Sequence, residues 1–399
     1  MSVALSNTVK GLSSSLTLQI NASVADLRAQ GVPVISLGAG EPDFDTPPHI
    51  RRAAVQAMEN GCTRYTSVSG ILPLRQAISK HIKKQKNLHY SPQEILVGAG
   101  VKQVLFEALQ ALINPGDEVL LPLPCWVSYP EMIRIAGGVP VPVSATADSG
   151  FLPAIDQLAA AVTPRTKALI LNTPANPSGA VWPPSLVKAV MSLAQTHHLF
   201  VISDEIYEDL VFGGASHLSP AAVSQDAFER TIVLSGLSKA YAMTGWRVGY
   251  AAGPQSVIAA MTALQSHTSG SINTIAQYAA LEALTASQSC VQEMRDTFAR
   301  RRKLLLHLLK EADLHPGVIP QGAFYLLLDI RPFLGKGMDQ EVICDDLCFA
   351  QLLLQKQHVA VVPGTAFGAD GFVRLSYAAS EQDLTCAVQR IGDFVRSLK

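Results

Sequence analysis

The sequence predicts an α/β protein with a large three-layer domain, built on a mostly parallel central sheet, and a smaller α+β domain. Short apolar runs of strand length alternate with helix-length segments along most of the chain. Continuous apolar runs are typical of parallel strands that are covered on both faces. The 399 residues, 48% of them hydrophobic, are enough for two domains or one large α/β unit.

The chain is expected to start with an irregular arm. Residues 1 to about 15 are polar and rich in serine. A helix should follow from about Thr17 to Gln30, and then a short strand that ends at Leu37. The segment Gly38–Pro48 combines glycine, proline and acidic residues, which is typical of a loop with a functional role.

The next part of the chain predicts the strands of the large domain. These apolar runs cover residues 95–97, 117–121, 168–171, 199–203 and 231–234. Helix-length segments separate them, as parallel neighbours require. In such sheets ligands bind at the carboxyl ends of the strands, so the residues that follow each run are the first candidates for a site.

The pattern changes in the last third of the chain. One long helical region is predicted over 278–312, followed by strands over 323–329, 359–363 and 372–376 and a helix over 381–397. We therefore expect a large domain over 47–289. Residues 1–46 and 290–399 should form the N-terminal arm and the small domain, because the loop at Gly38 must reach the same cleft as Arg374.

Composition excludes several classes of function. The formal net charge of −1 gives no drive to bind nucleic acid or an anionic membrane. The basic run Arg300–Lys303 precedes three leucines, which predicts the solvent-facing side of an amphipathic helix. There is no signal-peptide pattern, and no apolar stretch of about 18 residues that could span a bilayer.

The cysteines predict neither a disulfide framework nor a metal site. Six are scattered along the chain, at positions 62, 125, 290, 344, 348 and 386. Cys344 and Cys348 are one helical turn apart, but no second pair accompanies them, and they are interpreted as buried or incidental thiols. A reducing cytoplasm is the expected compartment.

Lys239 is the strongest candidate for chemistry. It follows the apolar run 231–234 and has small or apolar neighbours. Such surroundings lower the pKa of a lysine and make its amine a nucleophile, as Schiff-base formation with a carbonyl cofactor requires. Arg247, eight residues later, offers a planar pair of donors for a phosphate.

Five further features follow predicted strands, and each has an ordinary structural alternative. Gly98-x-Gly100 opens a helix that can hold a phosphate, but Gln103 stands where a dinucleotide fingerprint has its third glycine. Asp204 either meets a pyridinium cation, with Tyr207 nearby, or caps a helix.

Asn176 lies in a proline-rich loop that could be only a tight turn. Trp126 either stacks on a flat ring or belongs to the core. Arg374 lies on a half-buried strand, where it binds either a substrate carboxylate or an internal acid.

Taken together, these motifs resemble the class I aminotransferases of fold type I, which depend on pyridoxal 5′-phosphate. The likeness runs from about Ser15 to the C-terminus. It is carried by Gly-Glu-Pro-Asp-Phe-Asp-Thr-Pro at 40–47, Asn-Pro-Ser-Gly at 176–179, Ser-Asp-Glu-Ile-Tyr at 203–207 and Ser-Lys-Ala-Tyr-Ala-Met-Thr-Gly-Trp-Arg-Val-Gly at 238–249. The bacterial aspartate branch, which overlaps with prephenate aminotransferases, is the most similar.

The resemblance implies roles for the cofactor site. Lys239 would carry the cofactor as a Schiff base and move a proton to and from the substrate Cα, while Asp204 keeps the pyridine nitrogen protonated. Tyr207 and Asn176 would bond the phenolic oxygen of the cofactor. The remaining implied cofactor contacts are the ring stacking of Trp126, the phosphate contacts of Gly100, Val101, Ser238 and Arg247, the neighbouring Lys102, and Tyr65 from the partner in a homodimer.

The resemblance also implies how substrates are held. Arg374, the Gly40 backbone, Asn176 and Trp126 would surround the amino acid, with Arg374 on its α-carboxylate. Ser15, Thr17 and Lys102 match positions that contact a distal carboxylate. Gly236 is a departure, because many relatives have a phosphate-binding serine there; Ser235 precedes it.

The resulting hypothesis is transfer of an amino group from an L-amino acid, aspartate first, to 2-oxoglutarate. Prephenate, aromatic or alanine transamination, and a carbon–sulfur lyase on the same fold, remain alternatives. A nicotinamide dehydrogenase and a non-catalytic regulator are disfavoured. No metal, nucleic-acid or membrane partner is expected.

Overall fold

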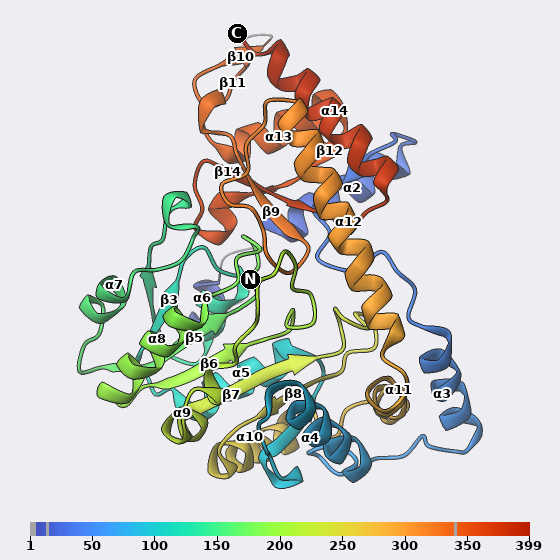
Figure 1. The fold of residues 1–399 in the computed structure, drawn as a ribbon, viewed down its shortest axis with the longest axis vertical. Helices are drawn as coiled ribbons and strands as arrows, with labels where there is room; N and C mark the ends of the chain where they lie inside the picture. Colours follow the sequence, from blue (N-terminus) through green and yellow to red (C-terminus); the bar gives the residue numbers. More distant parts are fainter. Residues whose placement is uncertain (1–4, 13–15, 339–340) are drawn as a thin grey trace.

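The computed structural model describes residues 5–12, 16–338 and 341–399. Within them, the centre of the molecule is a seven-stranded sheet in the order β2-β8-β7-β6-β5-β3-β4 (Figure 1). Its strands are β2 (Ile95–Gly98), β3 (Glu118–Pro122), β4 (Val139–Val143), β5 (Thr166–Asn172), β6 (Phe200–Asp204), β7 (Thr231–Gly236) and β8 (Gly249–Ala252). Strands β3 to β7 pair in parallel, and β8 is antiparallel to both neighbours. The predicted mostly parallel sheet is confirmed.

Helices cover both faces of this sheet, which gives the predicted three layers. Alternate strand residues point to opposite faces, so Leu121 and Ile170 pack in one core and Leu120 and Leu171 in another. One face is covered by α5 (Val101–Leu112), α6 (Ser128–Ile135) and α10 (Gln255–Thr268). The other face carries α3 (Pro48–Glu59), α4 (Leu72–Lys86), α7 (Ile155–Ala160), α8 (Pro184–Thr196), α9 (Gln225–Arg230) and α11 (Thr274–Thr285).

The C-terminal part of the chain has a core of its own. A three-stranded antiparallel sheet in the order β13-β14-β9 packs against helices around Phe298, Phe349 and Phe394. Its elements are α12 (Ser289–Glu311), β9 (Tyr325–Asp329), α13 (Asp346–Gln357), β13 (Val362–Pro363), β14 (Phe372–Ser376) and α14 (Glu381–Ser397). A short hairpin of β10 (Gly337–Met338) and β11 (Glu341–Val342) lies beside it.

The N-terminal segment contacts this second core. Strand β1 (Ile35–Ser36) pairs in parallel with β12 (Val359–Ala360), and the Ser376 amide donates to Leu37 O at 2.7 Å. Helix α2 (Leu16–Ala29) packs on the same side through Val24. These contacts bring the loop after Leu37 beside β14.

The helical region predicted over 278–312 consists of two helices. The chain forms α11 and α12 with a break at residues 286–288. The Gln288 side chain donates to Ala283 O at 3.0 Å and to Ala286 O at 2.9 Å. These bonds satisfy carbonyls at the end of α11 that would otherwise lack partners, and so stabilise the break.

The basic run Arg300–Lys303 is only partly solvent-facing. Arg300 and Lys303 are exposed, but Arg301 is buried and forms two bonds to the Asp43 carboxylate, at 2.6 and 2.8 Å. The expectation is therefore wrong for Arg301. Its ion pair ties α12 to the loop over 38–48.

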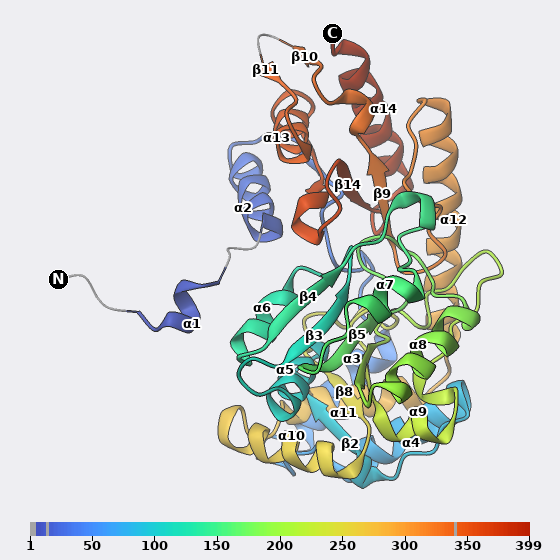
Figure 2. The ribbon, with the colours of Figure 1, turned by 90° about the vertical axis from the view of Figure 1, so that its left-hand side faces the viewer.

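Helix α1 (Asn7–Lys10) extends away from the body of the chain (Figure 2). Leu5 and Val9 are more than half exposed on this arm. No helix in the described ranges is both long and apolar enough to cross a membrane.

Candidate active site

Lys239 lies just after the carboxyl end of β7, where the sequence pattern placed it. Its Nζ donates to Gly40 O at 2.5 Å and lies about 6 Å from the ring centres of Tyr207 and Phe324. Burial lowers the pKa of Lys239 to about 8; Arg374 and Arg247 act in the same direction, and Glu41 opposes them. A useful fraction of the amine is therefore neutral near pH 8, as a nucleophile requires.

Asp204 ends the neighbouring strand β6 and is buried. Its carboxylate accepts a hydrogen bond from the Tyr129 hydroxyl at 2.7 Å and another from the Ile206 amide at 3.2 Å. Burial raises the pKa of Asp204 to about 6, although these bonds and Lys239 lower it. Among the described residues no ion pair reaches Asp204, so the site lacks the cation that a buried carboxylate normally has.

Tyr207 and Asn176 lie between Asp204 and β14. The Tyr207 hydroxyl is 3.0 Å from the Tyr325 hydroxyl, and both rings are buried. The Asn176 amide N–H donates to Asn172 Oδ1 at 2.9 Å, and Asn172 Nδ2 donates to Asp204 O. This chain of bonds fixes the loop after β5 against the end of β6.

Arg374 is the buried cation of the site. Its guanidinium donates to Asn176 Oδ1 and to Gly38 O, both at 2.9 Å, while its Nε has no partner. The ring centres of Tyr325 and Phe367 lie 4.4 and 4.8 Å from the central carbon of this guanidinium. No carboxylate pairs with it within the described part of the chain, so the alternative of an internal salt bridge finds no support.

A tight loop at the start of α5 faces Arg247. Gly100 has φ +86° at the N-cap position, and Arg247 donates to Ala99 O at 3.2 Å and to Thr244 O at 2.9 Å. A Cβ on Gly100 would lie 2.6 Å from Arg247 Nη2. Only glycine allows this approach, which leaves the Val101 amide at the positive end of the helix free to meet an anion.

The residues before Lys239 differ in their surroundings. The Ser235 hydroxyl donates to Glu208 at 2.8 Å, away from the loop at Gly100. A Cβ on Gly236 would lie 2.9 Å from Gly249 Cα, so a larger residue does not fit there without a shift. Ser238 is buried, directly between this strand end and Lys239.

Trp126 and Lys102 lie together at the edge of the site. Lys102 Nζ is 4.8 Å from the Trp126 ring centre, and the edge of Trp126 meets Tyr129 with centroids 5.3 Å apart. Burial, followed by the charge of Arg247, lowers the pKa of Lys102.

Of the other predicted residues, one lies apart from this cluster and two have side chains that are not described. Tyr65 is 97% exposed on the loop between α3 and α4. Thr17 lies in α2, with a side chain that is not described, and Ser15 lies outside the described residues. Gly40 contributes its carbonyl to Lys239, whereas the backbone group that meets Arg374 belongs to Gly38.

Two residues of the cluster were missed from the sequence. Tyr129 lies in the first turn of α6, three residues after Trp126, and its amide donates to Trp126 O at 3.1 Å. Tyr325 begins β9 and faces Tyr207 and Arg374. The first could have been found from the spacing, but the second depends on a pairing between distant segments.

A second charged cluster lies on the other face of the end of β6. Lys86 Nζ is 2.7 Å from Glu205 and 2.5 Å from Glu208, and His217 Nε2 is 3.0 Å from Glu205. The three acidic and imidazole groups are close enough to hold a metal, but the Lys86 ammonium lies on both carboxylates. Ser203 donates to Glu205 at 2.8 Å. The cluster is a buried ion-pair network.

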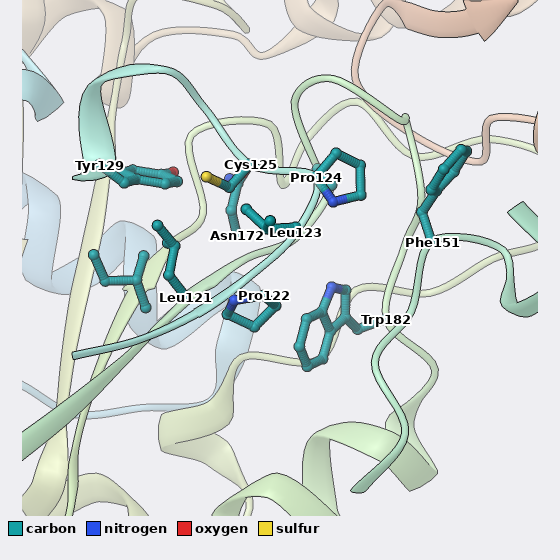
Figure 3. A pocket seen from close by; sticks show the side chains of 11 residues that line it. Leu121, Pro122, Leu123, Pro124, Cys125, Tyr129, Phe151, Asn172 and Trp182 are labelled. Atoms are coloured by element: carbon teal, nitrogen blue, oxygen red, sulfur yellow. The ribbon is translucent and has the colours of Figure 1, made fainter. Parts of the chain in front are cut away.

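A small cavity of about 20 Å³ lies behind Tyr129 and Asn172 (Figure 3). Pro124, Cys125 and Trp182 also line it. It has room for about one water molecule, and none for a substrate. The chemistry therefore belongs to the open side of the sheet end, around Lys239.

Comparison with known proteins identifies the class. Residues 32–391 match the family model of aminotransferases of class I and II. The chain belongs to this family and is an aminotransferase, an enzyme that moves amino groups.

Its relatives include an aspartate/prephenate aminotransferase of Thermus thermophilus, which is 46% identical over 97% of this chain and 98% of the relative. An aspartate aminotransferase of Bacillus sp. strain YM-2 is 44% identical over 99% of this chain and 100% of the relative. The solved aspartate aminotransferase of Rhizobium meliloti superposes over the full length of both chains with a TM-score of 0.96 at 39% identity. The predicted fold class and family are confirmed.

Proposed function

We propose that this enzyme transfers the amino group of an L-amino acid, with aspartate preferred, to 2-oxoglutarate, using pyridoxal 5′-phosphate. One observation carries the proposal. Asp204 is buried without a cation and Arg374 is buried without an anion, within the described residues, and both face Lys239. A protonated pyridine ring and a substrate carboxylate are the two charges that this site lacks.

The residues present fit this cofactor. Asp204 would hold its ring nitrogen, Tyr207 and Asn176 its phenolic oxygen, and Trp126 would stack on its ring. The phosphate would take the Val101 amide with Ser238, Arg247 and the nearby Lys102, because glycine at position 100 lets Arg247 approach the start of the helix. The Gly100 amide, which donates to Gly98 O at 2.8 Å, would have to turn to join them.

When bound, pyridoxal phosphate supplies an aldehyde for amino groups and a ring that draws electrons from the Cα of the amino acid. Lys239 would hold the cofactor between turnovers, and its Nζ would take the proton from Cα. Its pKa of about 8 suits both tasks, since the amine must be neutral to attack and to accept a proton.

The rest of the site holds the substrate. The guanidinium of Arg374 binds the α-carboxylate, and Asn176 and the loop at Gly38–Gly40 orient that guanidinium. The aromatic faces around it exclude water, which strengthens the ion pair.

Aspartate is preferred because a second cation stands near the entrance. Lys102 lies over Trp126, and we propose that it binds a distal carboxylate together with Thr17 and Ser15. Relatives carry the name aspartate aminotransferase, and a solved Thermus thermophilus relative, with a TM-score of 0.93 and 45% identity, contains maleate, itself a dicarboxylate.

A homodimer is part of the proposal. Tyr65 would reach the phosphate of the partner subunit, which explains why so large an aromatic ring is exposed. The Tyr65 loop is held to the segment at Asn273 through Thr274 and Arg64 O at 2.7 Å, and Asn273 lines an open cleft of about 530 Å³ beside Thr244. A second copy would fill this cleft.

We further propose two structural units, 47–289 and 1–46 with 290–399, since α12 starts at this boundary and packs in the second core. The compartment we propose is the cytoplasm, where six free thiols are expected to stay reduced.

A panel of amino donors with 2-oxoglutarate tests the proposal. Aspartate should give the highest kcat/KM among the donors, ahead of phenylalanine and alanine. With aspartate as the donor, 2-oxoglutarate should be a better acceptor than prephenate. Lys102→Ala should weaken dicarboxylic substrates more than alanine or phenylalanine, and equal losses for all would contradict its role. Lys239→Ala should lose turnover and the borohydride-stable attachment of the cofactor.

The same panel separates the alternatives. Formation of pyruvate and ammonia from a cystathionine-like thioether, without need for an oxo acid, would establish the lyase instead. Near wild-type transamination by Lys239→Ala would refute the assignment of the nucleophile.

A further inference from the structure

Cys344 and Cys348 bring two thiols together at the start of α13. Their Sγ atoms are 2.6 Å apart. Cys344 is exposed and Cys348 half-buried, far in sequence from the residues of the active site. Of the two expected alternatives, a buried or an incidental thiol, exposure excludes the first for Cys344.

The two thiols are in hydrogen-bonding contact, and they lie closer together than two ligands of one metal ion would. Non-bonded heavy atoms ordinarily lie about 3.5–4.0 Å apart, and a disulfide spans about 2.05 Å. Two thiolates on one tetrahedral zinc at about 2.3 Å would lie about 3.8 Å apart. Although Asp345 adds a third possible ligand, the pair is too close for a shared ion.

The backbone around the pair is fixed on both sides. The Asp345 side chain caps α13 by accepting from the Cys348 amide at 2.7 Å. Asp346, the next residue, accepts from the amide and the hydroxyl of Thr365 at 2.8 and 2.6 Å. Little conformational freedom must be lost for the sulfurs to meet.

The two thiols are unequal. The hydrogen bond with Cys344, and then burial, raise the pKa of Cys348 to about 11. Cys348 therefore keeps its proton at neutral pH, while the exposed Cys344 is the sulfur that a dissolved oxidant meets first.

We propose that Cys344 and Cys348 are a redox-active pair that closes a reversible disulfide within the folded chain on contact with a peroxide. The Cys344 sulfur attacks one peroxide oxygen, the O–O bond breaks, and a sulfenic acid and one water form. The Cys348 sulfur then displaces the hydroxyl from Cys344 as a second water. The two thiols lose two electrons and two protons, which the peroxide takes up.

This bond protects the exposed thiol. A lone sulfenic acid can be oxidised further to the irreversible sulfinic acid, but a neighbouring thiol captures it first. Because the sulfurs need to approach by only about half an ångström, α13 and the active site keep their places, and activity should be unchanged by oxidation.

The test uses the intact enzyme treated with hydrogen peroxide, then alkylated and digested. No lysine or arginine stands between Gly337 and Gln355, so both cysteines lie on one tryptic peptide. We expect the mass of this peptide to be two hydrogens below that of the dithiol form, and reduction with dithiothreitol should restore two thiols that can be alkylated. The treated enzyme should keep its activity to within about twofold of the untreated enzyme. Cys386→Ser is a matched control with a half-buried cysteine, and should behave as wild type.

Single variants check the order of steps. In Cys348→Ser, dimedone should trap a sulfenic acid on Cys344, and excess peroxide should convert it to the sulfinic acid. Two unmodified thiols in treated wild type, or a disulfide that joins two chains, would overturn the proposal. A zinc titration gives a further outcome that would overturn the proposal. In that outcome, wild type binds one equivalent of zinc, the zinc blocks alkylation of both cysteines, and Cys344→Ser no longer binds it.

Discussion

Replacing Tyr129 by phenylalanine should weaken cofactor binding through Asp204. The variant keeps the buried ring and removes only the hydroxyl, which donates to Asp204 at 2.7 Å. A hydrogen bond to a charged group is worth about 1.5–3 kcal/mol. Without this bond, part of Asp204 must lose a proton before it can pair with the ring, so the dissociation constant of pyridoxal phosphate at pH 7 should rise by roughly 2- to 10-fold.

The pH dependence gives the sharper readout. Burial raises the pKa of Asp204 from 3.8 to about 6, which makes its ionised form about 3 kcal/mol less favourable in the cofactor-free site. Only the ionised form pairs with a protonated ring, so wild-type affinity should rise with pH through about 6. Without the Tyr129 bond, the pKa of Asp204 should lie at about 7–8, and the midpoint should follow it.

The sign of the stability change follows from the same pKa. In the cofactor-free protein Asp204 stabilises the fold fully below pH 3.8, and this stability is lost as the pH rises to about 6.

Absorbance titrations with the cofactor from pH 5 to 9 would measure affinity and midpoint. Tyr241→Phe is the matched control, because that buried hydroxyl bonds Gln288 at 2.6 Å, outside the site. Equal affinities and equal midpoints for Tyr129→Phe and wild type would refute the reasoning.

Three further predictions concern other parts of the site. Lys86→Met should destabilise the protein by about 3–5 kcal/mol, because it strands the buried carboxylates of Glu205 and Glu208; urea unfolding would measure this, and a loss no larger than that of the exposed Lys84→Met would contradict it. Gly236→Ser should cost about 1–3 kcal/mol, since its Cβ would lie 2.9 Å from Gly249 Cα; Gly245→Ser, with open space around its Cβ, is the control for thermal unfolding, and equal melting temperatures would count against the close contact. The rate at which cofactor-free enzyme captures pyridoxal phosphate should rise with pH around a midpoint near 8, because the Lys239 amine must be neutral; a flat profile from pH 6 to 10 would contradict the lowered pKa.

Much of the fold could be predicted because its signals are local. Helix α14 spans Glu381–Ser397, as expected, since Ser380 caps its first turn and apolar residues recur at helical spacing. The break between α11 and α12 was missed because a single side chain, Gln288, stabilises it. Apolar periodicity does not report such a capping bond.

The site was predictable to the extent that its residues follow strands. Asp204 ends β6 and Lys239 follows the end of the neighbouring β7, and parallel pairing brings such ends together. Tyr325 and Lys86 could not be found this way, because their partners Tyr207 and Glu205 lie more than a hundred residues away in sequence. Buried ion pairs of this kind follow from the tertiary fold.

Two consecutive acidic residues at the end of β6, Asp204 and Glu205, lie in different electrostatic environments. Asp204 points to the side of Tyr129 and the proposed cofactor, while Glu205 and Ser203 point to the opposite face, where Glu205 meets Lys86. Because side chains alternate along a strand, slippage of β6 by one residue against β5 or β7 would exchange the two carboxylates. The lysine would then face the wrong acid, and the ring nitrogen would lose its partner. One register thus sets both the folded core and the catalytic centre, so an insertion or deletion within this strand cannot damage one without the other.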